Sequence, residues 1–360
     1  MPRISDSSAD SSAGSSAGSQ PGLRQIAAAA GVSAMTVSRV LRGSPHVSAD
    51  AKERVMKAAG ESGYRRDPAM AKLMVHLRRR KKSRCHAAIA ALTTIPGSIE
   101  PHPIRLVREG ARRRAESLGY RLELFRLKSA AGHNHSLGRI LAARGIEGVL
   151  LLQMVAPVNV DDLLDWENFS VVAATSSIIS PDFVRIGANY YHNARVLCAE
   201  IAARGFRRIG FAGTRTFGIR TNDAFVSAVL ANAMERGAPR VRPLVCDDFR
   251  TPRNGFRAWL AREKPDAIIA CAEEIVMPIQ KALASGPRSH TKIPVFCTSV
   301  DPASPICAGM DERHELVGHN AIEVLTGMIN RNEKNVTTAH VRTLVEGRWM
   351  EPGAIVSDGS

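Results

Sequence analysis

Two arginines lie beside short hydroxyl side chains in one segment near the N-terminus. Residues 27–43 read AAAAGVSAMTVSRVLRG, which places Arg39 and Arg42 next to Thr36 and Ser38. An arginine guanidinium can form paired hydrogen bonds with O6 and N7 of guanine, and hydroxyl groups bind phosphate oxygens. The residue types therefore indicate nucleic-acid recognition by a small, partly polar helix.

Three short helices are expected to position these side chains. Residues 23–31 form the first, Ser33 is placed to cap a second over 34–43, and Ser48 is placed to cap a third. Two short helices joined by a glycine-containing turn and followed by a third are typical of a helix-turn-helix, whose second helix lies in the major groove. Apolar residues at helical spacing predict its inner face: Ile26, Ala27, Ala30, Val32, Val37, Val40, Ala51, Val55, Ala58 and Ala59.

The charge distribution favours a polyanionic partner. The formal net charge is +15, and sixteen basic against six acidic residues place +10 of it in residues 1–84. A basic surface alone does not separate DNA from RNA or anionic lipid. The block 78–84 is either a solvated linker or a source of added phosphate contacts.

The rest of the chain has an α/β pattern. Short apolar runs alternate with segments of helical character, which predicts right-handed βαβ units on parallel sheets. About 260 residues are enough for two such lobes. The expected strands lie in 87–94, 121–127, 148–153, 170–175, 208–213, 267–272 and 294–299, and the clearest helices in 104–120, 193–206 and 221–237.

Residues 23–64 resemble the DNA-binding headpiece of the LacI/GalR repressor family. They carry its A-x-x-A-G-V-S-x-x-T-V-S-R-V-L run and the V-S-x-x-x-x-x-R-V motif that follows. A looser resemblance continues to about residue 356 through GARRRAESLGY, RGIEGVLLL, IAARGFRRIGFAG and LVGHNAIEVL. This part is similar to the family's periplasmic-binding-protein-like sensor, in which two doubly wound lobes hold an effector in a cleft.

We expect an α plus α/β chain in four parts. The Ser/Ala/Gly-rich composition predicts a disordered tail over 1–22, and the resemblance implies a helix-turn-helix domain over 23–64. Residues 65–84 form a hinge with a basic linker, and 85–356 an effector-binding and dimerisation domain.

The resemblance also implies DNA contacts for individual headpiece residues. Leu23 begins the helix that faces a phosphate, Tyr64 ends the headpiece, and Leu73 matches the hinge leucine that wedges into the minor groove. The usual hinge P-N-A-x-A-R-x-L is replaced by RDPAMAKL at 66–73, which leaves the wedge residue open. Base-reading positions are Ala34, Met35 and Arg39, and phosphate or groove-edge positions are Ser33, Thr36, Ser38, Arg42, His46 and Ser48.

Four residues are expected to bind an effector in the sensor domain. Arg220 stands near the family's sugar-binding arginine, Glu273 begins a pair that replaces Asn-Asp, Asp301 follows a strand, and Asn189 stands near an expected Asp. Placement at strand ends favours ligand contact in an open α/β sheet, although each residue is also suited to helix capping or the surface. The departures suggest an effector other than a simple sugar, or none.

The resulting interpretation is a ligand-responsive transcriptional regulator, a repressor that binds double-stranded operator DNA as a homodimer. Its effector would be a small polar molecule, carbohydrate-derived. The alternatives are a solute-binding module of the sugar-transport type, which would need an export signal and no headpiece, and an enzyme on the same fold. The sequence contains no G-x-G-x-x-G, Walker A, CxxC or H-E-x-x-H pattern.

No cofactor, catalytic residue or metal ligand is expected. G-S-S-A-G at 14–18 matches the nucleophile-elbow pattern but has no strand or helix beside it, and His133 and His135 have no further ligands near them in sequence. Six scattered cysteines suggest small core residues in a reducing compartment. Without a signal core or an apolar span, the expected location is the cytoplasm, with no membrane partner.

Overall fold

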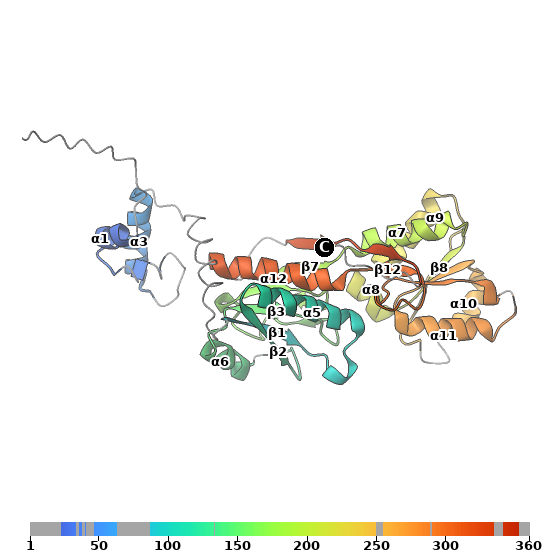
Figure 1. The fold of residues 1–360 in the computed structure, drawn as a ribbon, viewed down its shortest axis with the longest axis horizontal. Coiled ribbons are helices and arrows are strands. Elements are labelled where there is room, and N and C mark those ends of the chain that lie inside the picture. Colours follow the sequence, from blue (N-terminus) through green and yellow to red (C-terminus); the bar gives the residue numbers. More distant parts are fainter. Residues whose placement is uncertain are drawn as a thin grey trace, which may run out of the picture. The chain divides into compact units, whose positions relative to one another are not determined.

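The computed structural model describes two compact units within Met1–Arg80 and Lys81–Ser360 (Figure 1). The residues that it describes are 23–33, 36–37, 40, 47–62, 87–132, 134–249, 255–288, 290–334 and 341–352. The proposed hinge and linker, 65–84, lie outside them, so the four-part division of the chain stays a prediction.

The first unit contains the predicted small helical core. Helix α1 spans Leu23–Ala30 and α3 spans Ala49–Glu61, and Thr36, Val37 and Val40 between them are helical. The predicted inner face is confirmed, because one buried cluster contains Ile26, Ala27, Ala30, Val37, Val40, Val55, Ala58 and Ala59, with Val32 and Val47 packed against it and Ala51 also buried. Alanine and valine at these positions let short helices approach closely.

The second unit begins with a lobe built on a parallel six-stranded sheet of order β13-β7-β5-β3-β1-β2. Its strands are β1 Ala87–Thr93, β2 Tyr120–Arg126, β3 Gly148–Leu151, β5 Ser170–Ala173, β7 Val184–Ala188 and β13 Arg342–Val345. Its helices are α5 His102–Ser117, α6 His135–Ala143 and α12 His314–Arg331. Two short 3₁₀ helices lie at Gly97–Ile99 and Trp166–Asn168. A separate two-stranded sheet pairs β4 Val158–Asn159 with β6 Ile178–Ser180. We call this the first lobe.

Both faces of the first-lobe sheet are covered. Ala90 and Leu92 of β1 pack in the cluster that includes Leu141 of α6, and Ile89 and Ala91 pack in the cluster with α5 and α12. Successive side chains of a strand point to opposite faces, so an uninterrupted apolar run suits a sheet buried on both sides. The doubly wound architecture predicted from the sequence is confirmed.

The second lobe holds another six-stranded sheet, of order β14-β12-β11-β10-β8-β9, in which only β14 is antiparallel to its neighbour. Its strands are β8 Ile209–Thr214, β9 Leu244–Cys246, β10 Ala267–Ala270, β11 Val295–Cys297, β12 Gly309–Asp311 and β14 Arg348–Met350. Its helices are α7 Tyr190–Ala203, α8 Arg215–Thr221, α9 Ala224–Glu235, α10 Phe256–Glu263 and α11 Glu273–Ala284, with a turn at His290–Lys292.

The helix expected within 221–237 is confirmed as α9, Ala224–Glu235, and a separate short helix, α8, precedes it. Helix α8 ends at Thr221, and Asn222 and Asp223 adopt left-handed backbone conformations with φ of 51° and 53° before α9 begins. Asn and Asp tolerate this conformation better than other residues with a Cβ. The break places Arg220 in the last turn of a short helix.

The core role expected for the cysteines is confirmed for four of them. Cys198, Cys271, Cys297 and Cys307 are buried in the second-lobe core. Burial raises the pKa of Cys198 and Cys271 to about 12, so both remain neutral thiols at physiological pH.

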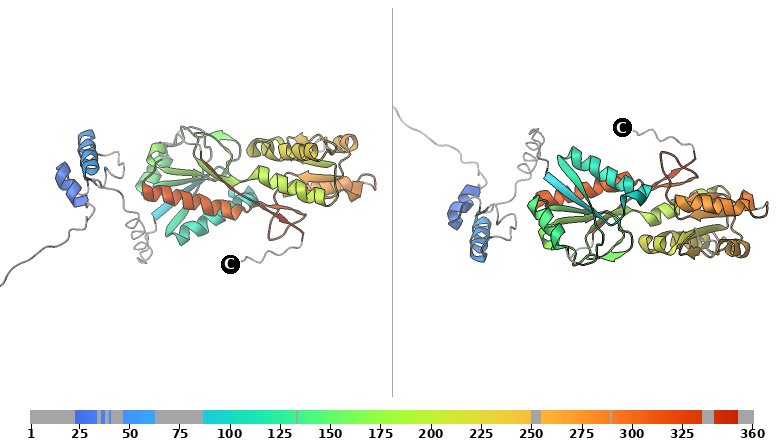
Figure 2. Two further views of the ribbon diagram at one scale, coloured as in Figure 1. Left: turned by 90° about the horizontal axis from the view of Figure 1, so that it is seen from above. Right: turned by 90° about the horizontal axis from the view of Figure 1, so that it is seen from below.

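The chain crosses between the two lobes more than once (Figure 2). The chain passes from β7 to α7, from β12 to α12 and from β13 to β14. The first and third crossings are hydrogen-bonded to each other, because the Asn189 amide donates to the Val345 carbonyl at 2.8 Å and the Gly347 amide donates to Asn193 Oδ1 at 2.8 Å. Bending between the lobes must therefore be accommodated at all three crossings.

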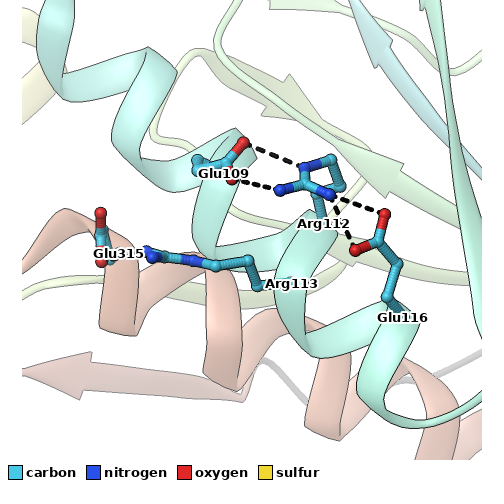
Figure 3. Close-up of polar contacts among 5 residues, drawn as sticks. All are labelled: Glu109, Arg112, Arg113, Glu116 and Glu315. Carbon is cyan, nitrogen blue, oxygen red and sulfur yellow. Dashed lines mark hydrogen bonds and ion pairs between the residues drawn. The ribbon is translucent and has the colours of Figure 1, made fainter.

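Charged side chains accompany the contact between α5 and α12 (Figure 3). Arg112 pairs with Glu109 and Glu116 along α5, at 2.5 Å and 2.7 Å, while Arg113 forms an ion pair with Glu315 of α12. Exposed pairs of this kind contribute at most about 1 kcal/mol each.

Candidate nucleic-acid interface and interlobe site

Four predicted DNA-contact residues lie in the described part of the headpiece. Leu23 is the first residue of α1, whose first turn has no acidic side chain. Ser33 Oγ accepts from the Thr36 amide at 3.1 Å, and Ser48 Oγ accepts from the Ala51 amide at 3.4 Å. The predicted capping roles of Ser33 and Ser48 are confirmed, and both side chains remain exposed at helix N-termini, where backbone N–H groups favour anions.

The other predicted DNA contacts lie outside the described residues. Their roles stay predictions: Ala34, Met35, Ser38, Arg39, Arg42, His46, Tyr64 and Leu73.

Arg220 joins the two lobes. It follows β8 in the second lobe, and its Nη2 donates to the carbonyl oxygen of Val155, which follows β3 in the first lobe, at 3.1 Å. Its Nε is buried and has no hydrogen-bond partner among the described residues. Burial lowers the pKa of this guanidinium, and a buried polar atom without a partner is uncommon in folded proteins.

Asp301 also joins the lobes. Its Oδ2 lies 3.4 Å from Nδ1 of His102, which begins α5 after strand β1 of the first lobe. The Asp301 amide donates to Glu273 Oε1 at 3.0 Å, so the predicted effector residues Glu273 and Asp301 are in direct contact. Burial raises the pKa of Glu273, and the neighbouring Asp301 carboxylate adds to this effect.

Asn189 is the N-cap residue of α7, at the crossing from β7 to α7. Its side-chain oxygen caps α7 by accepting from the His192 amide at 3.2 Å. This is the capping role that the sequence left open as an alternative to effector contact.

One buried acidic side chain of the second lobe was not predicted. Glu312 follows β12 and is 5% exposed; its Oε2 lies 3.3 Å from Nε2 of His314, and its Oε1 is buried without a hydrogen-bond partner in the described part of the chain. His314 Nε2 also lies 3.1 Å from the Ser299 hydroxyl. A search for polar residues after every strand would have found Glu312, but β12 is a three-residue strand that apolar periodicity does not reveal.

Tyr190 begins α7 and contacts the first lobe through Ser176. Burial raises the pKa of its phenol, which interacts electrostatically with both side chains and forms a hydrogen bond with the side chain of Ser176. Ser176 lies beyond β5 of the first lobe, whereas Tyr190 begins α7 of the second. Direct contacts thus join His102 to Asp301, Asp301 to Glu273, and Glu312 to His314. We call these residues, with Arg220 and Tyr190, the interlobe groups.

The described residues contain no group of three or more His, Cys, Asp or Glu side chains arranged to hold a metal ion. No helix in the same part of the chain is long and apolar enough to cross a bilayer. The interlobe groups are instead hydrogen-bond donors and acceptors suited to a small polar molecule.

Comparison with known proteins finds a matching family model for each of the two parts of the chain. The family model "Bacterial regulatory proteins, lacI family" matches residues 22–67, and "Periplasmic binding protein-like domain" matches 199–348. The HTH-type transcriptional regulator CelR of Thermobifida fusca is 26% identical over 344 residues, 92% of this chain and 97% of CelR.

Two similar solved structures support the fold. The structure titled transcriptional regulator CelR–cellobiose complex has a TM-score of 0.53 and 21% identity, covering 92% of this chain and 99% of that one. A lac repressor dimer bound to operator and the anti-inducer ONPF has a TM-score of 0.53 and 16% identity, covering 94% and 100%. The helix-turn-helix unit and the two-lobed unit together define a DNA-binding transcriptional regulator. The headpiece at 22–67 is that of the LacI family of bacterial regulatory proteins, and it is joined to a periplasmic-binding-protein-like domain.

Proposed function

We propose that this regulator is a repressor that binds double-stranded operator DNA as a homodimer and responds to a small polar, carbohydrate-derived effector between its lobes. The observation that carries the effector site is that two predicted effector residues, Arg220 and Asp301, make contacts between the lobes. A ligand that replaces or adds to these contacts will bind different lobe arrangements with different affinity, which is the requirement for shifting them.

The DNA-binding half of the proposal is supported by the headpiece core and its charge. We assign base edges to Ala34, Met35 and Arg39, and phosphates or groove edges to Ser38 and Arg42, as the resemblance of the headpiece to its family implies. Residues 1–84 carry +10 of the formal charge of +15. The cytoplasm is the compartment that this DNA partner implies.

Operator titration tests the linkage between the two sites. Binding sites are selected from random DNA, and fluorescence anisotropy then measures affinity for the best site with and without each sugar. Cellobiose is the first sugar to test because the similar CelR structure contains it. A true effector changes operator affinity, and operator DNA changes effector affinity by the same factor.

The substitutions Arg220→Ala and Asp301→Ala test whether the effector binds between the lobes. Both variants should weaken the effect of the sugar on operator affinity, whereas Glu167→Gln, at an exposed first-lobe position, should not. A sugar that stabilises the protein but leaves operator affinity unchanged, and still stabilises both variants, would contradict this effector site. No turnover is expected when the protein is incubated with sugar phosphates and nucleotides.

A further inference from the structure

Four segments of the second lobe lead directly into neighbouring parallel strands. They are 204–208 before β8, 236–243 before β9, 264–266 before β10 and 290–294 before β11. The strands lie side by side in the order β11-β10-β8-β9 and are parallel to one another. Because parallel strands begin at the same edge of a sheet, the four segments lie together at one edge of the second lobe.

These segments are strongly basic. They contain eight arginines or lysines and one acid: Arg204, Arg207, Arg208, Arg236, Arg240, Arg242, Lys264 and Lys292 against Asp266. Because +10 of the formal charge of +15 lies in residues 1–84, residues 85–360 carry +5. The four segments, which we call the basic edge, carry +7, so the remainder of 85–360 is slightly acidic.

Two acidic side chains at the basic edge have partners of their own. The carboxylate oxygens of Asp266 accept from the Arg207 and Arg208 amides at 2.9 Å each. One carboxylate oxygen of Glu263, at the end of α10, accepts from the Arg242 amide at 3.1 Å, and the other binds the arginine that precedes it. These contacts hold the segments before β8, β9 and β10 next to one another and leave most of the edge's charge uncompensated.

Four exposed basic side chains of the edge have no hydrogen bond or ion pair to the residues that the structure describes. They are Arg207, Arg240, Arg242 and Lys292. A base near the C-terminus of a helix is stabilised by the helix dipole, but this effect is confined to the last turn. Each of the four lies at least four positions beyond the end of the preceding α-helix. Helix capping therefore does not account for them.

The basic edge matches the phosphates of duplex DNA in spacing. Neighbouring strands are about 4.8 Å apart, so four strands span roughly 14 Å. Duplex DNA carries one negative charge per about 1.7 Å of its axis, so this length presents about eight phosphates to eight basic side chains. Lipid surfaces and unpaired bases are bound with exposed apolar or aromatic groups as well. None of the large exposed apolar side chains among the described residues lies in the four segments.

The basic edge lies on the side of the second lobe that faces away from the first. Arg220 and Asp301, which follow β8 and β11, contact the first lobe, so the carboxyl ends of the second-lobe strands point toward it. The basic edge is at the amino ends of the same strands. The chain enters from the headpiece at β1 of the first lobe, and an effector between the lobes leaves the basic edge uncovered.

We propose that the basic edge is a second DNA-binding surface, which holds the phosphate backbone of a duplex segment other than the operator and does not read its sequence. The inference goes beyond the proposed function, which assigns DNA binding to the headpiece alone. With operator on the headpiece, the regulator holds two DNA segments at once. Phosphate contacts release counterions, so this binding weakens steeply with salt.

The test uses the full chain with one short, unlabelled operator duplex per two chains. Fluorescence anisotropy then measures binding of a labelled duplex that lacks the operator, at salt concentrations from about 50 to 200 mM. The edge variant combines Arg207→Gln, Arg240→Gln, Arg242→Gln and Lys292→Gln. The control variant removes four exposed charges from the first lobe, by Arg105→Gln, Arg126→Gln, Lys128→Gln and Arg139→Gln.

Wild type and control should bind the second duplex, and the edge variant should bind it at least about tenfold more weakly at low salt. The magnitude of its salt slope should be smaller by about three, because up to four phosphate contacts are lost. Equal binding by the edge variant and wild type would show that a spare headpiece holds the second duplex, and the inference would be wrong. Failure of wild type to bind the second duplex at low salt would also overturn it.

Two further outcomes are separated in the same experiment. Vesicles of equimolar phosphatidylcholine and phosphatidylserine are offered in parallel, and vesicle binding that the edge variant loses, without duplex binding, would assign the edge to lipid instead. If no operator is found, the proposed operator binding fails, while the three proteins compared on the non-operator duplex alone still decide for the edge. If the fourfold variant does not fold, the pairs Arg207→Gln/Lys292→Gln and Arg240→Gln/Arg242→Gln should each show part of the loss.

Discussion

Gly110 of α5 packs directly against the backbone of α12, and Gly318 of α12 packs directly against the backbone of α5. A Cβ built at Gly110 would be 2.0 Å from the carbonyl oxygen of Glu315, and one built at Gly318 would be 1.9 Å from that of Val107. Both clashes would be with backbone carbonyl oxygens, which no side-chain rotation can move, so the two helices would have to move apart. The reciprocal glycines fix how closely α12 approaches α5 in the first lobe.

We therefore expect Gly110→Ala and Gly318→Ala to lower the free energy of unfolding by about 1–3 kcal/mol each, the usual range for an overpacked core. Urea unfolding followed by circular dichroism measures the effect. Gly327→Ala is the matched control on α12, because its new Cβ would meet only the end of the Arg331 side chain at 3.0 Å. Helix propensity then favours alanine by up to about 1 kcal/mol. Equal losses in all three variants would contradict the close-packing explanation.

Specificity should depend on Arg39 rather than Arg42. Arg39→Ala is expected to remove guanine discrimination of roughly 1–3 kcal/mol, since Arg39 is proposed to read a base edge. Arg42→Ala should weaken binding to all sequences about equally, as a phosphate contact does. Selection of sites from random DNA measures both effects. An unchanged site preference for Arg39→Ala would show that another residue reads the bases.

Operator binding should weaken steeply with salt. Each phosphate contact contributes a slope of about −0.9 to the plot of log affinity against log salt concentration, because counterions are released on binding. Anisotropy titrations between low and moderate salt measure the slope, and Arg42→Ala should reduce its magnitude by about one contact. Affinity that is nearly independent of salt would contradict a phosphate-binding headpiece.

Glu273 should make a pH-dependent contribution to stability. Burial raises the pKa of its carboxyl, so the folded state binds this proton more tightly than the unfolded state. The stabilising contribution is complete below the unfolded pKa and is lost as the pH rises through the folded pKa. Glu273→Gln, which keeps an acceptor for the Asp301 amide, should therefore raise the melting midpoint relative to wild type at pH 7 more than at pH 4. A midpoint difference that does not change with pH would show that desolvation of this carboxylate is unimportant.

The sequence by itself determined the local elements and the class of protein. Helical spacing identified the headpiece core from Ile26 to Ala59, hydroxyl residues identified the caps at Ser33 and Ser48, and apolar runs located the buried strands. These features depend on residues within one or two turns or one strand of each other. Their periodicity is therefore visible in the sequence.

Only the tertiary structure decided which residues meet between the lobes. His102 and Asp301 are brought together by the crossings between two sheets, and Glu312 follows a strand too short to be recognised by its pattern. The left-handed pair Asn222 and Asp223 separates α8 from α9, a boundary that the apolar pattern does not mark. Contacts of this kind arise from how whole lobes and helices pack. No local pattern of residue types specifies a partner some two hundred positions away, because the partner is chosen by the geometry of the packed elements.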